Sequence, residues 1–148
     1  MPKTKIFIGS SKAAKSQTKA VIKQFESATL EFVPWWDAFT AGLTLLEELD
    51  NIRGKVDGAI LLFSPEAEST VRGNTVKIPN LNVLFEFGYF YGHFSKKKVA
   101  MLKYGEFYLP SDFGGYIHIF GSTFFRRSGA VPVSERTQDE FNRWIAQL

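Results

Sequence analysis

A continuous apolar run, Ala59-Ile-Leu-Leu-Phe63, constrains the fold of this chain more than any other segment. Asp57-Gly58 precedes it and Ser64-Pro65 follows it, so turn signals bound it on both sides. The run has no alternating polar side, and a strand of this kind is buried on both faces, as in the middle of a parallel sheet. The sequence therefore predicts a central parallel strand over residues 57–64.

Segments with strand and helix character alternate on both sides of this run. We expect strands over 5–9, 29–33, 98–102 and 116–120, helices over 13–27, 43–52, 80–94 and 134–148, and loops over 35–42 and 65–77. This alternation is typical of an α/β fold with a doubly wound parallel sheet, and five strands favour the flavodoxin-like order 2-1-3-4-5. The 148 residues are expected to form one domain, 1–148.

Composition excludes several classes of function. The chain has no cysteine, which removes disulfides, thiolate metal sites and a cysteine nucleophile, and its two histidines complete no ligand pattern, so no metal is expected. A net charge of +3 without a basic module argues against nucleic acid as a partner. The sequence shows no signal peptide and no long apolar span, so we expect a cytoplasmic protein without a membrane partner.

The segment 80–94, NLNVLFEFGYFYGHF, contains a single acid, Glu86, among bulky apolar residues. Wound as a helix it would be apolar around nearly its whole circumference, so most of it is expected to be buried. A buried carboxylate is unfavourable unless it is paired or lines a cavity. Asn82 lies one turn earlier on the same face, which indicates a site. The alternative is a Glu86 that pairs with a lysine or lies at the solvated edge of the helix.

A turn after the first strand offers a second polar group. Gly9-Ser10-Ser11 opens onto a helix, and such a turn can bind phosphate or ribose through its backbone N–H groups and hydroxyls. The stretch from Gly9 to Ser16 almost matches a P-loop, but Ala14 replaces the second glycine, so a triphosphate loop is not favoured.

Three aromatic residues, Trp35, Trp36 and Phe39, follow the second strand, and Ser64 ends the third. Each aromatic could also belong to the core. In open α/β sheets, however, ligands bind beyond the carboxyl ends of the strands, at the switch between strands 1 and 3. The sequence therefore predicts a pocket there, with phosphate donors, aromatic walls and one acid.

These motifs resemble those of a known family, the bacterial TIR-like effector domains of CBASS and Pycsar anti-phage systems, as in TIR-STING and TIR-SAVED proteins. The shared pattern comprises KIFIGSS at 5–11, tryptophans at 35–36, DGAILLFS at 57–64, NVLFEFGYFYG at 82–92 and PSDFGG at 110–115. The resemblance implies a TIR-like fold and hydrolysis of NAD⁺ to nicotinamide and an ADP-ribose product, with Glu86 as the catalytic residue. NAD⁺ is then the substrate, and no cofactor is expected.

The predicted pocket indicates the binding residues, and the resemblance indicates the partners. The expected substrate-binding residues are Gly9, Ser10, Ser11, Trp35, Trp36, Phe39, Ser64 and Asn82. The expected partners are other copies of the domain, through TIR–TIR contacts, and a cyclic-nucleotide sensor domain of the STING or SAVED kind. That sensor would lie on a longer chain or on a separate protein.

Three functions stay open at this point. The first is an NAD⁺ hydrolase effector activated by oligomerisation. The second is a non-catalytic TIR-type module that only self-associates, favoured by Asn80-Leu81 where the family has Arg-Asp. The third is an enzyme similar to nucleoside 2-deoxyribosyltransferases, which share the flavodoxin-like layout and a glutamate nucleophile, and which would act on a nucleoside.

Overall fold

Strand β3 (Gly58–Phe63) lies at the centre of a parallel sheet, as its apolar sequence predicts. The computed structural model describes residues 2–39, 41–109, 117–122 and 133–148. β3 is buried along its whole length between β1 (Thr4–Gly9) and β6 (Val99–Tyr104). β2 (Leu30–Pro34) and β7 (Ile117–Ser122) form the edges, which gives the order β2-β1-β3-β6-β7 with all pairs parallel. The predicted flavodoxin-like α/β fold is thereby confirmed.

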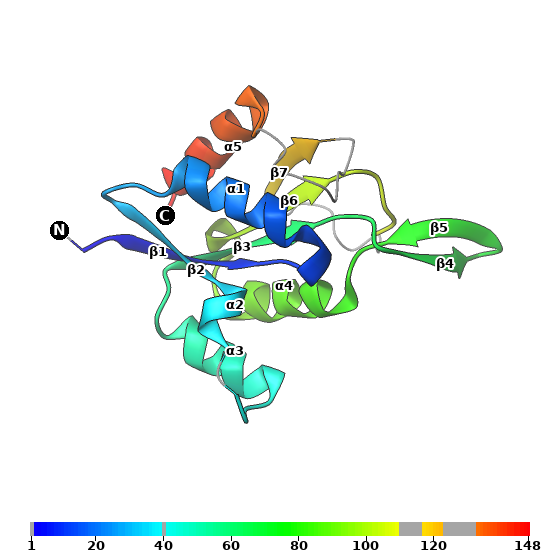
Figure 1. Ribbon diagram of the computed structural model, residues 1–148, viewed down its shortest axis with the longest axis horizontal. Coiled ribbons are helices and arrows are strands. Elements are labelled where there is room, and N and C mark those ends of the chain that lie inside the picture. Colours follow the sequence, from blue (N-terminus) through cyan, green and yellow to red (C-terminus); the bar gives the residue numbers. More distant parts are fainter. Residues whose placement is uncertain (1, 40, 110–116, 123–132) are drawn as a thin grey trace.

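Helices cover both faces of the sheet (Figure 1). α1 (Lys15–Phe25) and α5 (Glu135–Ile145) pack on one face, and α3 (Leu45–Arg53) and α4 (Leu81–His93) pack on the other. Successive residues of β1 belong to opposite cores, with Ile6 and Ile8 in the first and Phe7 in the second. Because both faces of the sheet are covered, its central strands need apolar residues at every position.

α3, α4 and α5 each begin at a residue whose side chain accepts a backbone N–H group, whereas Ala14 before α1 does not. Ser134 caps α5, since its Oγ accepts the N–H of Thr137 at 3.1 Å. Asn80 caps α4, and its Oδ1 accepts the N–H groups of Asn82 and Val83 at 2.9 and 3.1 Å. Asn80 therefore fixes where α4 begins, next to the carboxyl ends of the strands.

The segment after β3 differs from its prediction as a loop. It forms an antiparallel hairpin of β4 (Ala67–Val71) and β5 (Asn74–Ile78), which projects beyond the sheet (Figure 1). Arg72 and Gly73 form the turn with φ values of 51° and 80°, as two-residue hairpins require. Both strands are polar and mostly exposed, so the sequence lacked the apolar alternation by which strands are recognised.

Three short helices complete the described elements: η1 (Lys12–Ala14), α2 (Trp35–Ala38) and η2 (Lys96–Lys98). α2 replaces the first half of the predicted aromatic loop. The PSDFGG motif at 110–115 and the segment 123–132 after β7 lie outside the described residues. Within the described ranges, none of the helices has the length and apolar character needed to cross a membrane.

Candidate functional site

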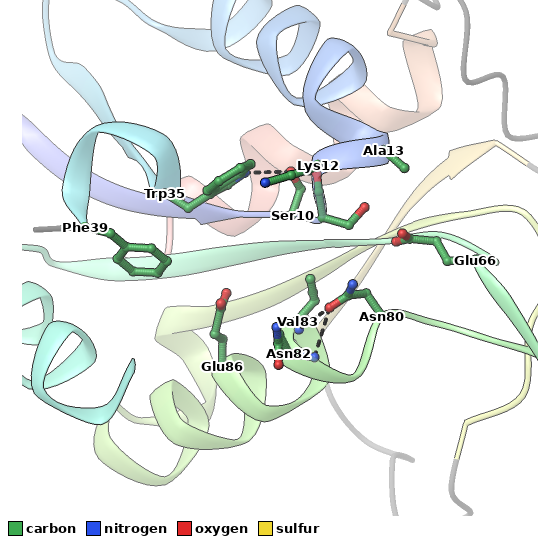
Figure 2. A pocket seen from close by; sticks show the side chains of 11 residues that line it. Ser10, Lys12, Ala13, Trp35, Phe39, Glu66, Asn80, Asn82, Val83 and Glu86 are labelled. Carbon is green, nitrogen blue, oxygen red and sulfur yellow. Dashed lines mark hydrogen bonds between the residues drawn. The ribbon is translucent and has the colours of Figure 1, made fainter. Parts of the chain in front are cut away.

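A cavity of about 370 Å³ opens at the carboxyl ends of β1 and β3 (Figure 2). Its walls come from the turn after β1, from α2 and its C-terminal end, from the segment after β3 and from the first turns of α4. The lining residues are Ser10, Ser11, Lys12, Ala13, Trp35, Phe39, Glu66, Asn80, Asn82, Val83 and Glu86. This place lies between β1 and β3, where the strand order reverses and where open α/β sheets bind their ligands.

Glu86 projects from α4 into this cavity, below Trp35 and Phe39 in Figure 2. Its side chain is 5 % exposed, and its Oε2 atom is buried with no hydrogen-bond partner in the part of the chain that the structure describes. Burial raises the pKa of this carboxyl from its ordinary 4.5 to about 7, because the ionised form is poorly solvated there. Glu86 is therefore a buried carboxyl in the cavity wall, and one of its oxygens has no hydrogen-bond partner among the described residues.

Gly9 makes room for this carboxylate. A Cβ atom on Gly9 would lie 2.8 Å from Oε2 of Glu86, 2.5 Å from Cδ1 of Leu61 and 3.1 Å from Cε1 of Phe7. All three distances are shorter than ordinary van der Waals contact, so a larger residue would force at least one of these groups to move. Gly9 thus acts by the close approach of its backbone to Glu86 and is not among the lining residues.

Trp35 is held in place by the turn after β1. Its Nε1–H donates to Oγ of Ser10 at 2.9 Å, and this hydroxyl donates in turn to the backbone oxygen of Ser11 at 3.0 Å. Oγ of Ser11 accepts the N–H of Ala14 at 3.3 Å and so caps η1. Both serine hydroxyls are therefore engaged with protein atoms, and that of Ser10 orients the indole wall of the cavity.

The predicted site residues fall into two groups. Ser10, Ser11, Trp35, Phe39, Asn82 and Glu86 line the same cavity, whereas Trp36 and Ser64 do not. Trp36 lines a separate groove beside α1, where the ammonium groups of Lys15 and Lys19 lie 5.0 and 6.0 Å from its ring centroid. Ser64 donates weakly to Oε2 of Glu66, at 3.4 Å, and so contacts the cavity only through that residue.

Sequence reasoning missed Lys12, Glu66 and Asn80 as lining residues. Lys12 and Glu66 give the rim one charge of each sign. The position of Lys12, directly after the Gly-Ser-Ser turn, indicates that it lines the cavity. Glu66 lies in a segment predicted as a loop, and nothing in the sequence places that segment at the cavity. Asn80 lines the cavity as a result of capping α4.

The arrangement suits a flat, positively charged ligand group. Aromatic faces attract cations, and a carboxylate in a poorly hydrated place stabilises positive charge that develops beside it. Across the described ranges 2–39, 41–109, 117–122 and 133–148, no three His, Cys, Asp or Glu side chains gather as metal ligands.

Comparison with known proteins identifies the family. Residues 5–121 match the family model described as CAP12/Pycsar effector protein, TIR domain.

Three relatives show the range of similarity. A CD-NTase-associated protein 12 from Sphingobacterium faecium is 31% identical over 127 residues, which are 86% of this chain and 38% of the relative. Another from a Lachnospiraceae bacterium is 26% identical over 147 residues, 99% of this chain and 46% of the relative. The Pycsar effector protein PaPycTIR of Pseudomonas aeruginosa is 34% identical over 88 residues, 57% of this chain and 29% of the relative.

The chain thus spans less than half the length of these relatives. The match to the family model runs from residue 5 in β1 to residue 121 in β7, so it includes the cavity and Glu86. The predicted resemblance to bacterial TIR-like effector domains is confirmed, and the chain belongs to the CAP12/Pycsar effector TIR-domain family.

Proposed function

We propose that this domain hydrolyses NAD⁺ at the bond between nicotinamide and ribose, releasing nicotinamide and ADP-ribose. The observation that supports this most is the buried Glu86 carboxyl in the wall of a cavity that Trp35 and Phe39 also line. Its Oε2 has no hydrogen-bond partner within the described ranges. Nicotinamide in NAD⁺ is a flat cationic ring, and aromatic walls bind such rings through their π faces.

The chemistry needs one carboxylate and no acid. The bond between C1′ of the ribose and the ring nitrogen breaks with its electron pair going to nitrogen, so nicotinamide leaves as a neutral molecule. Positive charge then develops on the ribose, and the ionised Glu86 stabilises it. Water adds to C1′ and gives up a proton, which the Glu86 carboxylate can accept because burial raises the pKa of this carboxyl to about 7.

The rest of the cavity offers groups for the remainder of the dinucleotide. The ammonium of Lys12 is exposed at the rim and suits the pyrophosphate as a charged hydrogen-bond donor. Asn82 and Glu66 line the same space and can accept hydrogen bonds from ribose hydroxyls. Gly9 keeps the Glu86 carboxylate where the reacting ribose would lie.

The names of the relatives support a biological setting for this activity. They are called CD-NTase-associated and Pycsar effector proteins. We infer that the domain is a cytoplasmic effector of a bacterial anti-phage system, activated by oligomerisation. A cyclic-nucleotide sensor of the STING or SAVED kind, on a longer chain or a partner protein, would supply the signal.

A second candidate is a module that self-associates without catalysis. Two large apolar side chains on α4, Leu81 and Phe85, are 67 % and 48 % exposed, which favours a role in contacts. In this case the raised pKa of Glu86 would be a by-product of burial, and no substrate would be consumed.

Nicotinamide release from NAD⁺ separates the two candidates. The protein is incubated at high concentration with a crowding agent, and nicotinamide is measured by liquid chromatography for wild type, Glu86→Gln and Glu68→Gln. Glu68 is the matched control, because it is exposed on β4, pairs with Lys77 and lies outside the cavity lining. We expect release by wild type and Glu68→Gln, and at least about a hundredfold slower release by Glu86→Gln.

Two results would change the assignment. Release at the wild-type rate by Glu86→Gln would mean that another residue supports the reaction. Absence of release from every variant, with assembly confirmed by light scattering, would favour the self-association module.

A further inference from the structure

The solvent-facing side of α4 is apolar. The sequence predicts that most of this helix is buried, and the structure shows that this is wrong for one side, where Leu81 and Phe85 are exposed. Gly88 and Gly92 continue the same side and are exposed as well. α4 has one acidic residue, the buried Glu86, and no lysine or arginine. None of these charged residue types therefore lies on its solvent-facing side. A surface of this kind marks a contact with another molecule or segment.

The four residues form one stripe, because positions 81, 85, 88 and 92 follow the spacing at which helix residues share a side. We call this stripe the α4 face. A Cβ atom added to Gly88 or to Gly92 would meet none of the described residues within 4 Å. The α4 face therefore consists of two protruding side chains at its N-terminal end and a shallow depression at its C-terminal end.

α3 extends the apolar surface. Asp50 accepts a hydrogen bond from the hydroxyl of Tyr89, and Arg53 bonds Nδ1 of His93, so α3 runs beside α4 with these positions in contact. Leu46 lies one turn before Asp50 and is 52 % exposed. Three of the five large apolar side chains that are exposed in the described part of the chain, Leu46, Leu81 and Phe85, thus belong to these two helices.

We propose that the α4 face binds the α4 face of a second copy of this chain, with the two helices antiparallel about a twofold axis. Along the α4 face two large residues are followed by two small ones. When a second copy of the helix runs in the opposite direction, its small residues lie opposite the large residues of the first. When Phe85 lies over the partner's Gly88, the same register places Leu81 over the partner's Gly92. The twofold axis then repeats both contacts, as in an isologous interface. The antiparallel helix dipoles favour this pairing too.

The contact reaches the candidate site. Leu81 lies between Asn80 and Asn82, both of which line the cavity, and Glu86 projects from the other side of the same helix. Binding of a second copy would therefore fix the first turn of α4 at the cavity rim. The inference deepens the proposed activation by assembly. Its test uses no substrate, so its failure is distinguishable from failure of the proposed reaction.

Sedimentation velocity over a range of protein concentrations tests the contact. Wild type is compared with Phe85→Glu, with Gly88→Leu and with the control Tyr108→Gln, which alters an exposed aromatic residue outside α3 and α4. Leucine favours helix over glycine, so Gly88→Leu fills the depression without unfolding the monomer. We expect wild type and Tyr108→Gln to form dimers, and both α4 variants to dimerise at least about tenfold more weakly.

The other outcomes overturn the proposal. A wild-type chain that stays monomeric at every concentration would show that something else covers the α4 face, such as a further segment of a longer chain. Dimerisation of both α4 variants at wild-type strength would place the contact elsewhere on the molecule.

Cysteine cross-linking tests the direction of the helices. The chain has no cysteine, so Leu81→Cys and Gly92→Cys can be introduced singly and together. The two positions are about 16 Å apart along one helix, too far for a disulfide within a chain. The antiparallel pair predicts covalent dimers for the double variant and not for either single variant. Cross-linking by Leu81→Cys alone would indicate parallel helices and overturn the proposed symmetry.

Discussion

Replacing Glu86 with glutamine should make the fold more stable relative to wild type as the pH rises. The reason is the raised pKa of the buried carboxyl. In the unfolded chain the carboxyl ionises at its ordinary pKa of 4.5, whereas in the folded chain burial raises the pKa to about 7. Between these values the unfolded state binds fewer protons than the folded state, so the stability of wild type falls as the pH increases.

The size of the effect follows from the two pKa values. A difference from 4.5 to about 7 corresponds to roughly 3 kcal/mol in the free energy of unfolding. The contribution of Glu86 is fully present below pH 4.5, declines as the pH rises through about 7, and is absent above that. Glutamine has nearly the same shape and does not titrate, so Glu86→Gln lacks this decline. A buried amide carries its own cost of about 1–3 kcal/mol, but that cost does not depend on pH.

Urea unfolding at a series of pH values from below 5 to above 8 measures this difference. The quantity to follow is the free energy of unfolding of Glu86→Gln minus that of wild type, because other carboxyl groups cancel in it. It should rise by roughly 3 kcal/mol across the range, while Glu68→Gln stays close to parallel with wild type. A difference that stays constant with pH would refute the reasoning, since it would mean that Glu86 ionises in the folded protein as it does in water.

Two further predictions concern the same carboxyl. Gly9→Ala should lower the free energy of unfolding by about 1–3 kcal/mol, measured by urea denaturation, because its methyl group collides with Leu61 and with Oε2 of Glu86. It should also reduce nicotinamide release, and full stability with full activity would show that the close approach is unimportant. If the proposed reaction uses ionised Glu86, the rate of nicotinamide release at low NAD⁺ concentration should rise with pH through about 7. A rate that is flat from pH 5 to 9 would contradict this role.

Most of the sheet could be predicted from the sequence because its central strands must be apolar on both sides. β1, β3 and β6 are buried between two helical layers, and this requirement leaves a clear signal of short apolar runs between turn residues. The β4–β5 hairpin leaves no such signal, since it packs against little and its residues are free to be polar. Its stability comes from its backbone pairing and from the Arg72-Gly73 turn.

The candidate site was predictable in composition but not in detail. An acid in an apolar helix and polar turns after buried strands indicate a pocket, and the topology brings them to one edge of the sheet. The hydrogen bond between Trp35 and Ser10, and the turning of Trp36 away from the cavity, depend on the direction of each ring within a single helical turn. Neighbouring tryptophans carry no sequence signal for that direction.

The prediction that most of α4 is buried was wrong for its solvent-facing side, and for a different reason. The prediction assumes that the apolar surface of the helix is buried within its own chain, but Leu81 and Phe85 are exposed there. An apolar pattern predicts that a helix surface is buried. It does not indicate whether the same chain or another molecule buries that surface.

A backbone hydrogen bond joins the two ends of the β4–β5 hairpin. The N–H of Glu66 donates to the backbone oxygen of Ile78 at 2.9 Å, so the chain leaves and re-enters the fold at nearly the same point. The residues between Glu66 and Ile78 can be lengthened, shortened or exchanged without moving β3 or α4, because an insertion there does not change the distance between these two residues. The hairpin can thus change in length while Glu66, which lines the cavity at its base, and Glu86 stay where they are.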